Sequence, residues 1–181
     1  MNLPTFRYHP DPLKTGSIEA SDRKCVCCGQ ARGYIYTGPV YAAEDLDDAL
    51  CPWCIADGSA HEKFEADFVD ADGIGGYGDW DDVPEEVIEE VATRTPGFSG
   101  LQQERWWTHC GDAAEFLGPV GQAEAIAAGK DFLEAIREDA AIEDDDDWSD
   151  YLESLNRDHG PTAYLFRCRH CGKLGGYSDS D

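Results

Sequence analysis

Two Cys-x-x-Cys pairs constrain the fold of this chain more than any other feature. Cys25 and Cys28 form the first pair, Cys51 and Cys54 form the second, and 22 residues separate them. Zn²⁺ is bound tetrahedrally by deprotonated cysteines, and one Cys-x-x-Cys turn can present two sulfurs to one ion. Gly29 suits the end of such a turn, because glycine takes positive φ without a Cβ clash. The spacing therefore predicts a closed zinc site that supports folding rather than catalysis.

The C-terminal cysteines leave a second metal site open. Cys168 and Cys171 form a third Cys-x-x-Cys pair, and together with Cys110 they supply three sulfurs that would need a fourth ligand. His109 and His159 are the candidates, although adjacent residues rarely bind one metal together, which disfavours His109 beside Cys110. Alternatively, Cys168 and Cys171 form one half of the first site. Spacing does not decide which pairs meet, so one Zn²⁺ is predicted and a second stays open.

A thiol-redox enzyme is the catalytic alternative. Cys168-Arg-His-Cys171 lies between two predicted strands, not at a helix start, where thioredoxin-like motifs are found. Cys27 is interpreted as a spare residue of the first turn. The chain has no G-x-S-x-G, phosphate loop or H-E-x-x-H, so an enzyme is the less favoured interpretation. Basic residues beside the cysteines would favour thiolates; these are Arg23, Lys24, Arg32, Arg167, Arg169 and Lys173.

Residues 1–68 are expected to form an N-terminal zinc-knuckle region. The prolines of residues 1–15 predict an extended lead-in without a helix. Residues 17–21 and 32–37 read as strands on either side of the first cysteine turn. Pro52 is well placed to begin a helix that is interrupted near Gly58. A cysteine turn that runs directly into a helix resembles the second half of a treble-clef finger.

Residues 69–160 are expected to form an acidic, mostly helical region. Helices are predicted from Pro84 to residue 94, over 101–110, and over 123–138 with a break at Gly129. The Trp106-Trp107 pair suggests one indole packed inward and one near a groove. Residues 112–117 read as a short turn or helix, and Ser149 as the cap of a last helix after the acidic run 143–147.

Residues 161–181 are expected to form a C-terminal β-hairpin that carries the third Cys-x-x-Cys pair. Residues 162–167 have a strand pattern and residues 173–177 can return beside them. The predicted fold class is thus α+β: a small zinc-ribbon or treble-clef-like cysteine module packed on a mostly helical middle region. The whole chain, 1–181, reads as a single domain.

The charge of the chain excludes one class of partner. Thirty-eight acidic residues against fourteen basic ones give a formal net charge of −24. Direct nucleic-acid binding is excluded as the main function, because phosphate binding relies on clustered Lys and Arg. The acidity indicates either a solvated, self-repelling surface or a surface that attracts a basic protein. No stretch is long enough for a membrane span and no secretory signal is present, so a reducing cytoplasm is expected.

Several motifs together resemble the CbrC family of bacterial proteins, over essentially the whole chain. The most specific is Cys51-Pro-Trp-Cys-Ile55 with the Asp-Gly-Ser-Ala60 that follows it. The other matching segments are Phe6-Arg-Tyr-His-Pro-Asp-Pro-Leu13 with Thr15-Gly16, Cys25-x-x-Cys28-Gly29, Arg94-Thr-Pro-Gly97, Gln102-Gln-Glu-x-Trp106, His109-Cys110 and Tyr164-Leu-Phe-Arg-Cys-x-His-Cys-Gly172.

The resemblance implies a role in toxin tolerance, because this family is linked to tolerance of colicin E2, a nuclease toxin. An immunity-like protein would bind a basic nuclease through complementary charge, with aromatic anchors such as Tyr77, Trp80 or Trp148. The alternatives are a zinc-containing enzyme or thiol-redox protein of unknown substrate, and a regulatory adaptor. The sequence does not give the oligomeric state.

Overall fold

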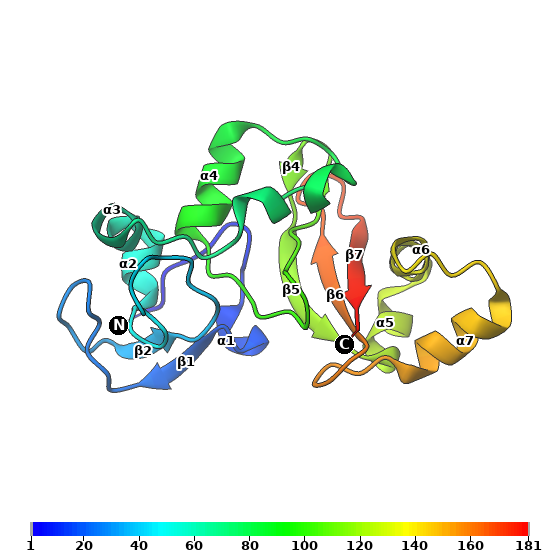
Figure 1. Ribbon diagram of the computed structural model, residues 1–181, viewed down its shortest axis with the longest axis horizontal. Coiled ribbons are helices and arrows are strands. Elements are labelled where there is room, and N and C mark those ends of the chain that lie inside the picture. Colours follow the sequence, from blue (N-terminus) through cyan, green and yellow to red (C-terminus); the bar gives the residue numbers. More distant parts are fainter. Residues whose placement is uncertain (1, 181) are drawn as a thin grey trace.

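The computed structural model describes residues 2–180 and has the expected mixed α+β architecture (Figure 1). The N-terminal cysteine module, a three-stranded sheet and a group of helices follow one another along the longest axis. In chain order the elements are α1 (Pro12–Thr15), β1 (Ile18–Ser21), β2 (Gly33–Tyr36), α2 (Pro52–Ala56), α3 (Ser59–Phe64), the short 3-10 turns η1 (Ala71–Gly73) and η2 (Gly76–Gly78), α4 (Glu85–Arg94), β3 (Thr108–His109), β4 (Asp112–Ala113), β5 (Glu115–Val120), α5 (Gln122–Ala128), α6 (Lys130–Asp139), α7 (Asp145–Ser154), β6 (Thr162–Arg167) and β7 (Leu174–Asp179).

The N-terminal module forms as the sequence predicts, apart from its lead-in. Strands β1 and β2 pair antiparallel on either side of the first cysteine turn. Pro52 occupies the first turn of α2, and Gly58 in the left-handed region separates α2 from α3. The lead-in differs, because Asp11 caps the single helical turn α1, in which Pro12 takes the first position that tolerates proline. Buried cysteines form part of the hydrophobic core of this module.

The central sheet has the strand order β5-β6-β7 and is antiparallel throughout. Its β6–β7 hairpin is the one that the sequence predicts. The turn or short helix predicted over 112–117 is wrong, because residues 115–120 form the edge strand β5, whose residues alternate between half-buried and buried. Proline is tolerated on an edge strand, and the register shift between Phe116 and Gly118 accommodates the Gly118-Pro119 pair.

The predicted helix over 101–110 is wrong. This segment is extended: Trp106 forms a parallel bridge with Ile74, and β3 begins at Thr108. Trp106 is fully buried and its indole N–H donates to the carbonyl of Ala114 at 3.0 Å. Trp107 packs over Gly175 of β7, where a Cβ would overlap the indole ring. The two indoles therefore lie inward and at a groove, as expected, but an extended segment before β3 positions them rather than a helix.

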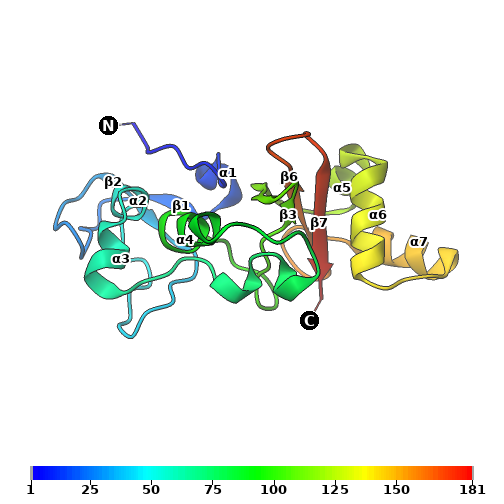
Figure 2. The same cartoon turned by 90° about the horizontal axis from the view of Figure 1, so that it is seen from above.

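Helices α5, α6 and α7 lie at the far end of the molecule, where α6 packs against β7 and α5 contacts β5 and the other two helices (Figure 2). The break at Gly129 between α5 and α6 is confirmed. The last helix begins within the acidic run, because Asp144 rather than Ser149 accepts hydrogen bonds from its first N–H groups. The segment that contains these three helices begins and ends at the same place, because the N–H of Gln122 donates to the carbonyl of Leu155 at 3.1 Å. In the described portion of the chain, no helix has the length and apolar character to cross a bilayer.

Candidate metal centres and an adjoining cleft

Four cysteine sulfurs converge in the N-terminal module. The sulfurs of Cys25 and Cys54 are 3.8 Å apart, those of Cys28 and Cys51 are 3.9 Å apart, and those of Cys51 and Cys54 are 3.6 Å apart. A tetrahedral zinc site with Zn–S bonds of about 2.3 Å has S···S edges of about 3.8 Å, whereas a disulfide bond is about 2.05 Å long. The group, called the first cluster below, therefore has the dimensions of a four-thiolate metal site.

The thiols of the first cluster cannot all ionise without a cation. Hydrogen bonding from Cys51 lowers the pKa of Cys25 to about 4, and the backbone N–H of Cys51 donates to the same sulfur at 3.2 Å. The pKa of Cys51 is raised by the hydrogen bond between Cys51 and Cys25 and by the burial of Cys51. Burial also raises the pKa of Cys54, to about 12. Ionisation of one thiol thus makes ionisation of its neighbours less favourable, and a bound divalent cation would stabilise all four thiolates together.

The first and third Cys-x-x-Cys turns have the same backbone hydrogen bonds. The N–H of Cys25 donates to the carbonyl of Gln30 and the N–H of Gly29 to that of Cys25, at 3.0 and 2.7 Å. In the third turn, Cys168 donates to Lys173 and Gly172 to Cys168, at 2.8 and 3.0 Å. Gly29 and Gly172 both have positive φ, 72° and 76°. The chain therefore builds the same cysteine knuckle twice, which the repeated Cys-x-x-Cys-Gly pattern signals.

A second cluster forms around the third Cys-x-x-Cys turn. His109, Cys110, Cys168 and Cys171 offer ligand atoms that all lie within 4.8 Å of one another. Nδ1 of His109 is 3.2 Å from the sulfur of Cys110 and 3.6 Å from that of Cys171. Zinc bonded to one imidazole and three thiolates would have N···S edges of about 3.6 Å.

The structure shows which histidine joins the three cysteines of the second cluster, a choice between His109 and His159 that the sequence left open. His109 joins the three cysteines of the second cluster, whereas His159 is exposed in the loop before β6 and is no member. The third Cys-x-x-Cys pair also does not share the first cluster.

A tight turn lets the adjacent residues His109 and Cys110 converge. β3 and β4 pair His109 with Asp112, which leaves Cys110 and Gly111 as a two-residue hairpin loop. Both loop residues have positive φ, 59° and 68°, as a type I′ turn requires. The objection that neighbouring residues rarely bind one metal assumes ordinary backbone geometry. It does not apply here, because the left-handed Cys110 directs its sulfur back toward the His109 ring.

The two clusters differ in burial. Cys25, Cys51 and Cys54 are buried, but in the second cluster only Cys168 is, and Cys110 and Cys171 are exposed. Although burial opposes it, N–H groups of the knuckle lower the pKa of Cys168 to about 6. Desolvation and the neighbouring thiols raise the pKa of Cys110 to about 11. A metal ion at the second cluster would therefore be open to exchange with solvent.

Asp112 joins the β3–β4 hairpin to the third cysteine turn. This buried carboxylate accepts from the Tyr8 hydroxyl at 2.9 Å, from Arg169 at 2.8 Å and, with protonated Nε2, from His170 at 3.0 Å. Burial raises its pKa, but these three partners outweigh burial and lower it overall. The sequence offers no pattern that would identify Asp112, since its partners come from distant segments.

Three of the six basic residues beside the cysteines contact carboxylates. Arg169 pairs with Asp112, Arg167 with Glu115 and Arg23 with Asp48. A lysine that sequence reasoning missed, Lys63 of α3, donates to the carbonyls of Val26 and Cys27 at 3.0 and 3.1 Å. These arginines form ion pairs, and the lowered pKa values of Cys25 and Cys168 come from hydrogen bonds rather than from basic side chains.

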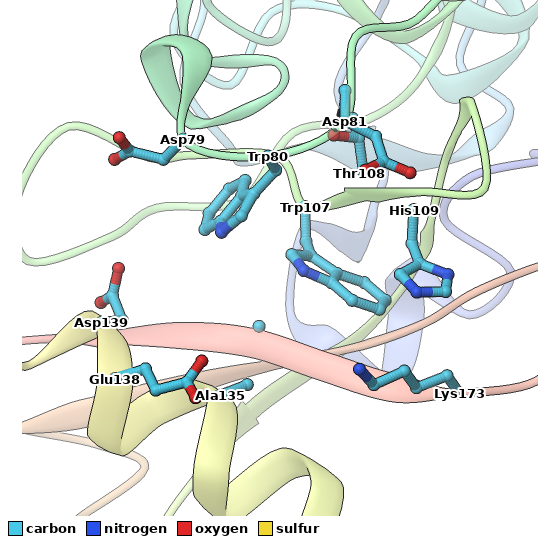
Figure 3. A pocket seen from close by; sticks show the side chains of 11 residues that line it. Asp79, Trp80, Asp81, Trp107, Thr108, His109, Ala135, Glu138, Asp139 and Lys173 are labelled. Atoms are coloured by element: carbon cyan, nitrogen blue, oxygen red, sulfur yellow. Dashed lines mark hydrogen bonds between the residues drawn. The ribbon is translucent and has the colours of Figure 1, made fainter.

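A cleft of about 530 Å³ adjoins the second cluster (Figure 3). Its walls come from the turn at residues 79–81, strand β3 with the residue before it, helix α6, and the β6–β7 hairpin. His109 belongs both to the second cluster and to this wall, and its ring stacks on Trp107 with centroids 5.2 Å apart. The lining residues are Asp79, Trp80, Asp81, Trp107, Thr108, His109, Ala135, Glu138, Asp139, Lys173 and Gly176.

Comparisons with known proteins identify relatives along nearly the whole chain. A family model described as "Uncharacterised protein family (UPF0167)" matches residues 3–180. UPF0167 protein Mb2317 of Mycobacterium bovis is 54% identical, with 98% of this chain and 93% of that protein covered. UPF0167 protein PA1536 of Pseudomonas aeruginosa is 44% identical, with 94% and 93% covered. No solved structure matches at a significant level.

Proposed function

Because this chain belongs to the UPF0167 family, whose description assigns no activity, we propose from its own geometry that it is a zinc-stabilised acidic protein that binds a basic protein. Its resemblance to the CbrC family supports a role in toxin tolerance or immunity, with a nuclease toxin as the partner. On this proposal the whole chain acts as one domain, made of the zinc-knuckle region (residues 1–68), the acidic region (residues 69–160) and the C-terminal hairpin (residues 161–181).

Zinc is the metal proposed for both clusters. Sulfur-rich tetrahedral sets favour zinc, and the S···S separations of 3.6 to 3.9 Å in the first cluster fit it. Each cluster offers four groups, which fills a tetrahedron and leaves no position for a substrate. All eight cysteines are free thiols, which fits a reducing compartment, and we therefore infer a cytoplasmic location.

The observation that carries the binding proposal is the net charge of −24 together with where the acids lie. Carboxylates of the turn 79–82, the start of α4 and the start of α7 are exposed. Such a surface accelerates association with a basic protein and gives the complex strong salt dependence. Tyr77, which precedes the turn 79–82 in sequence, is 55% exposed and is available as an aromatic anchor.

The test is association with the nuclease domain of colicin E2, measured by calorimetry in about 0.02 M and about 0.3 M NaCl. Binding at low salt that weakens at high salt is expected. Lysozyme, a basic protein that is not a nuclease, serves as the charge control and should bind more weakly. If neither protein associates at low salt, binding to a basic partner is ruled out. Equal affinity for both would remove the toxin-specific element of the proposal.

One observation favours the zinc-enzyme alternative: His109 connects the second cluster to a cleft. An enzyme would need an open coordination position there. Substituting Co²⁺ for zinc and adding azide tests this, because an anion that enters the coordination shell shifts the visible absorption of the cobalt. An unchanged spectrum would indicate a closed site and would rule out the zinc-enzyme alternative at this cluster.

A further inference from the structure

The cleft beside the second cluster carries negative charge that the fold does not neutralise. Among residues 2–180, neither Glu138 nor Asp81 forms an ion pair with a basic side chain. Asp139 differs, since it pairs with Arg105 at 2.7 Å. Glu138 and Asp81 come from opposite walls of the cleft, α6 and the turn 79–81, so that two uncompensated carboxylates border one cavity (Figure 3).

Arg105 shows how this region of the molecule holds a guanidinium group. Its guanidinium carbon lies 5.1 Å from the ring centroid of Trp80 and 4.3 Å from that of Tyr177, while Asp139 accepts two hydrogen-bonding contacts from it. An aromatic face combined with a carboxylate is the arrangement that recognises a cationic side chain. The open portion of the cleft offers the unpaired carboxylates of Glu138 and Asp81, and the indoles of Trp80 and Trp107 form part of its wall.

We propose that this cleft is a binding site for a cationic side chain, an arginine guanidinium or a lysine ammonium, that the basic partner inserts. The inference rests on the proposed function and specifies which surface and which chemistry it uses. Lys173 is the one cation of this chain that lines the cleft within the described residues, and Figure 3 shows its ammonium pointing into the cavity. The lining carboxylates outnumber this one ammonium, so that the cleft keeps a negative charge for the ligand to neutralise.

The experiment titrates N-acetyl-arginine methylamide into the zinc-loaded protein and follows the indole N–H signals of Trp80 and Trp107 by NMR. Saturable shifts at these two indoles are expected. Glu138→Gln and Asp81→Asn should each weaken binding about fivefold, the effect of one ion pair of about 1 kcal/mol. All four altered positions, controls included, are exposed or half-buried at the surface, so that the variants keep the fold.

Matched controls separate a site from general attraction to negative charge. Glu134→Gln removes the same charge one turn earlier on α6, where Glu134 pairs with Lys130 outside the cleft. Asp82→Asn does the same beside Asp81. Neither control should change the affinity by more than about twofold. If controls and cleft variants weaken binding equally, or if the indoles do not respond to the probe, the site is overturned.

The colicin E2 nuclease domain, tested with the same variants, distinguishes this proposal from the proposed function. Binding that Glu138→Gln weakens supports both. Nuclease binding that is insensitive to the cleft variants overturns the site and keeps the function. Saturable binding of the arginine probe without any association with basic proteins supports the site and overturns the function.

Discussion

At the scale of single residues, Cys27 and Cys54 show how position rather than residue type decides which thiols can bind a metal. Cys27 lies between two members of the first cluster in sequence, but its sulfur is 3.6 Å from the hydroxyl of Ser59 and outside the cluster. Cys54 lies on α2, whose first turn directs the sulfur toward Cys25. The knuckle therefore carries a natural control for every test of the first cluster.

Cys54→Ser should remove one equivalent of zinc and lower the free energy of unfolding by at least about 3 kcal/mol, because apparent zinc binding in small domains is on the order of 10 kcal/mol. Cys27→Ser should keep both zinc ions and change stability by less than about 1 kcal/mol. Elemental analysis and urea denaturation measure the two effects. An equal loss of zinc in both variants would contradict the assignment of the first cluster.

His9 should make the protein less stable in mild acid. Its ring is fully buried, with Nδ1 2.7 Å from the carbonyl of Pro96 and Nε2 2.7 Å from the hydroxyl of Thr15. Burial lowers the pKa of His9 to about 4, below the value of about 6.5 in an unfolded chain. The unfolded state therefore binds more protons in this window, and the stabilisation present above about pH 6.5 is lost as the pH falls toward 4.

Between pH 7 and about pH 5 this loss should be about 2 kcal/mol. His9→Gln should be less stable at pH 7, because it loses ring contacts with Phe116, but its stability should fall less between the two pH values. Urea denaturation of both proteins at both pH values gives the difference, in which any acid sensitivity of the clusters cancels. Parallel losses in the two proteins would show that His9 is not the responsible group.

At the scale of elements, sequence patterns predicted those helices, strands and turns that depend on interactions between residues close together in the chain. The strands beside the first cysteine turn, the helix that begins at Pro52 and the break at Gly129 were all predicted, because turn geometry and helix caps act over a few residues. The segment 101–110 was read as a helix because its extended form depends on a bridge to Ile74 and on Gly175 of β7. Those partners lie too far along the chain for a local pattern to reveal.

The candidate site divides in the same way. The first cluster could be predicted from the spacing of its cysteines, because each Cys-x-x-Cys turn presents two sulfurs and only one contact between two such turns is needed to form the site. The choice of His109 for the second cluster depended on a type I′ turn in which a cysteine takes positive φ, an uncommon conformation for that residue. The role of Asp112 was missed because Tyr8, Arg169 and His170 reach it through the tertiary fold.

The β3–β4 hairpin should be strained when no metal is bound. Asparagine tolerates the left-handed region better than cysteine, and Asn-Gly is the preferred pair for a type I′ turn. Cys110→Asn should therefore lose one zinc ion, but in excess chelator it should be more stable than the unmodified protein by about 0.5–1 kcal/mol. Cys171→Ser should lose the same ion without this gain. A destabilised Cys110→Asn protein in chelator would contradict the strain.

At the scale of the whole molecule, the charge of −24 should make stability and partner binding respond to salt in opposite directions. Salt screens repulsion between exposed carboxylates, with a Debye length of about 10 Å at 0.1 M. The melting temperature should rise by several degrees between about 0.05 M and about 0.5 M NaCl, while binding to a basic protein weakens. Calorimetry in NaCl and in KCl separates screening from specific ion effects. A melting temperature that falls in both salts would contradict this expectation.

The hydrogen bond between Gln122 and Leu155 has a consequence for how the chain can change over time. Everything between those residues leaves the sheet and returns to the same spot, and neither sulfur cluster takes a member from it. Substitutions on the exposed face of this stretch would therefore leave the groups of both clusters in place. Because α6 forms one wall of the cleft, substitutions on it would be expected to change which ligand the cleft binds. The architecture thus separates the segments that carry the cysteines from the helix that forms one wall of the cleft.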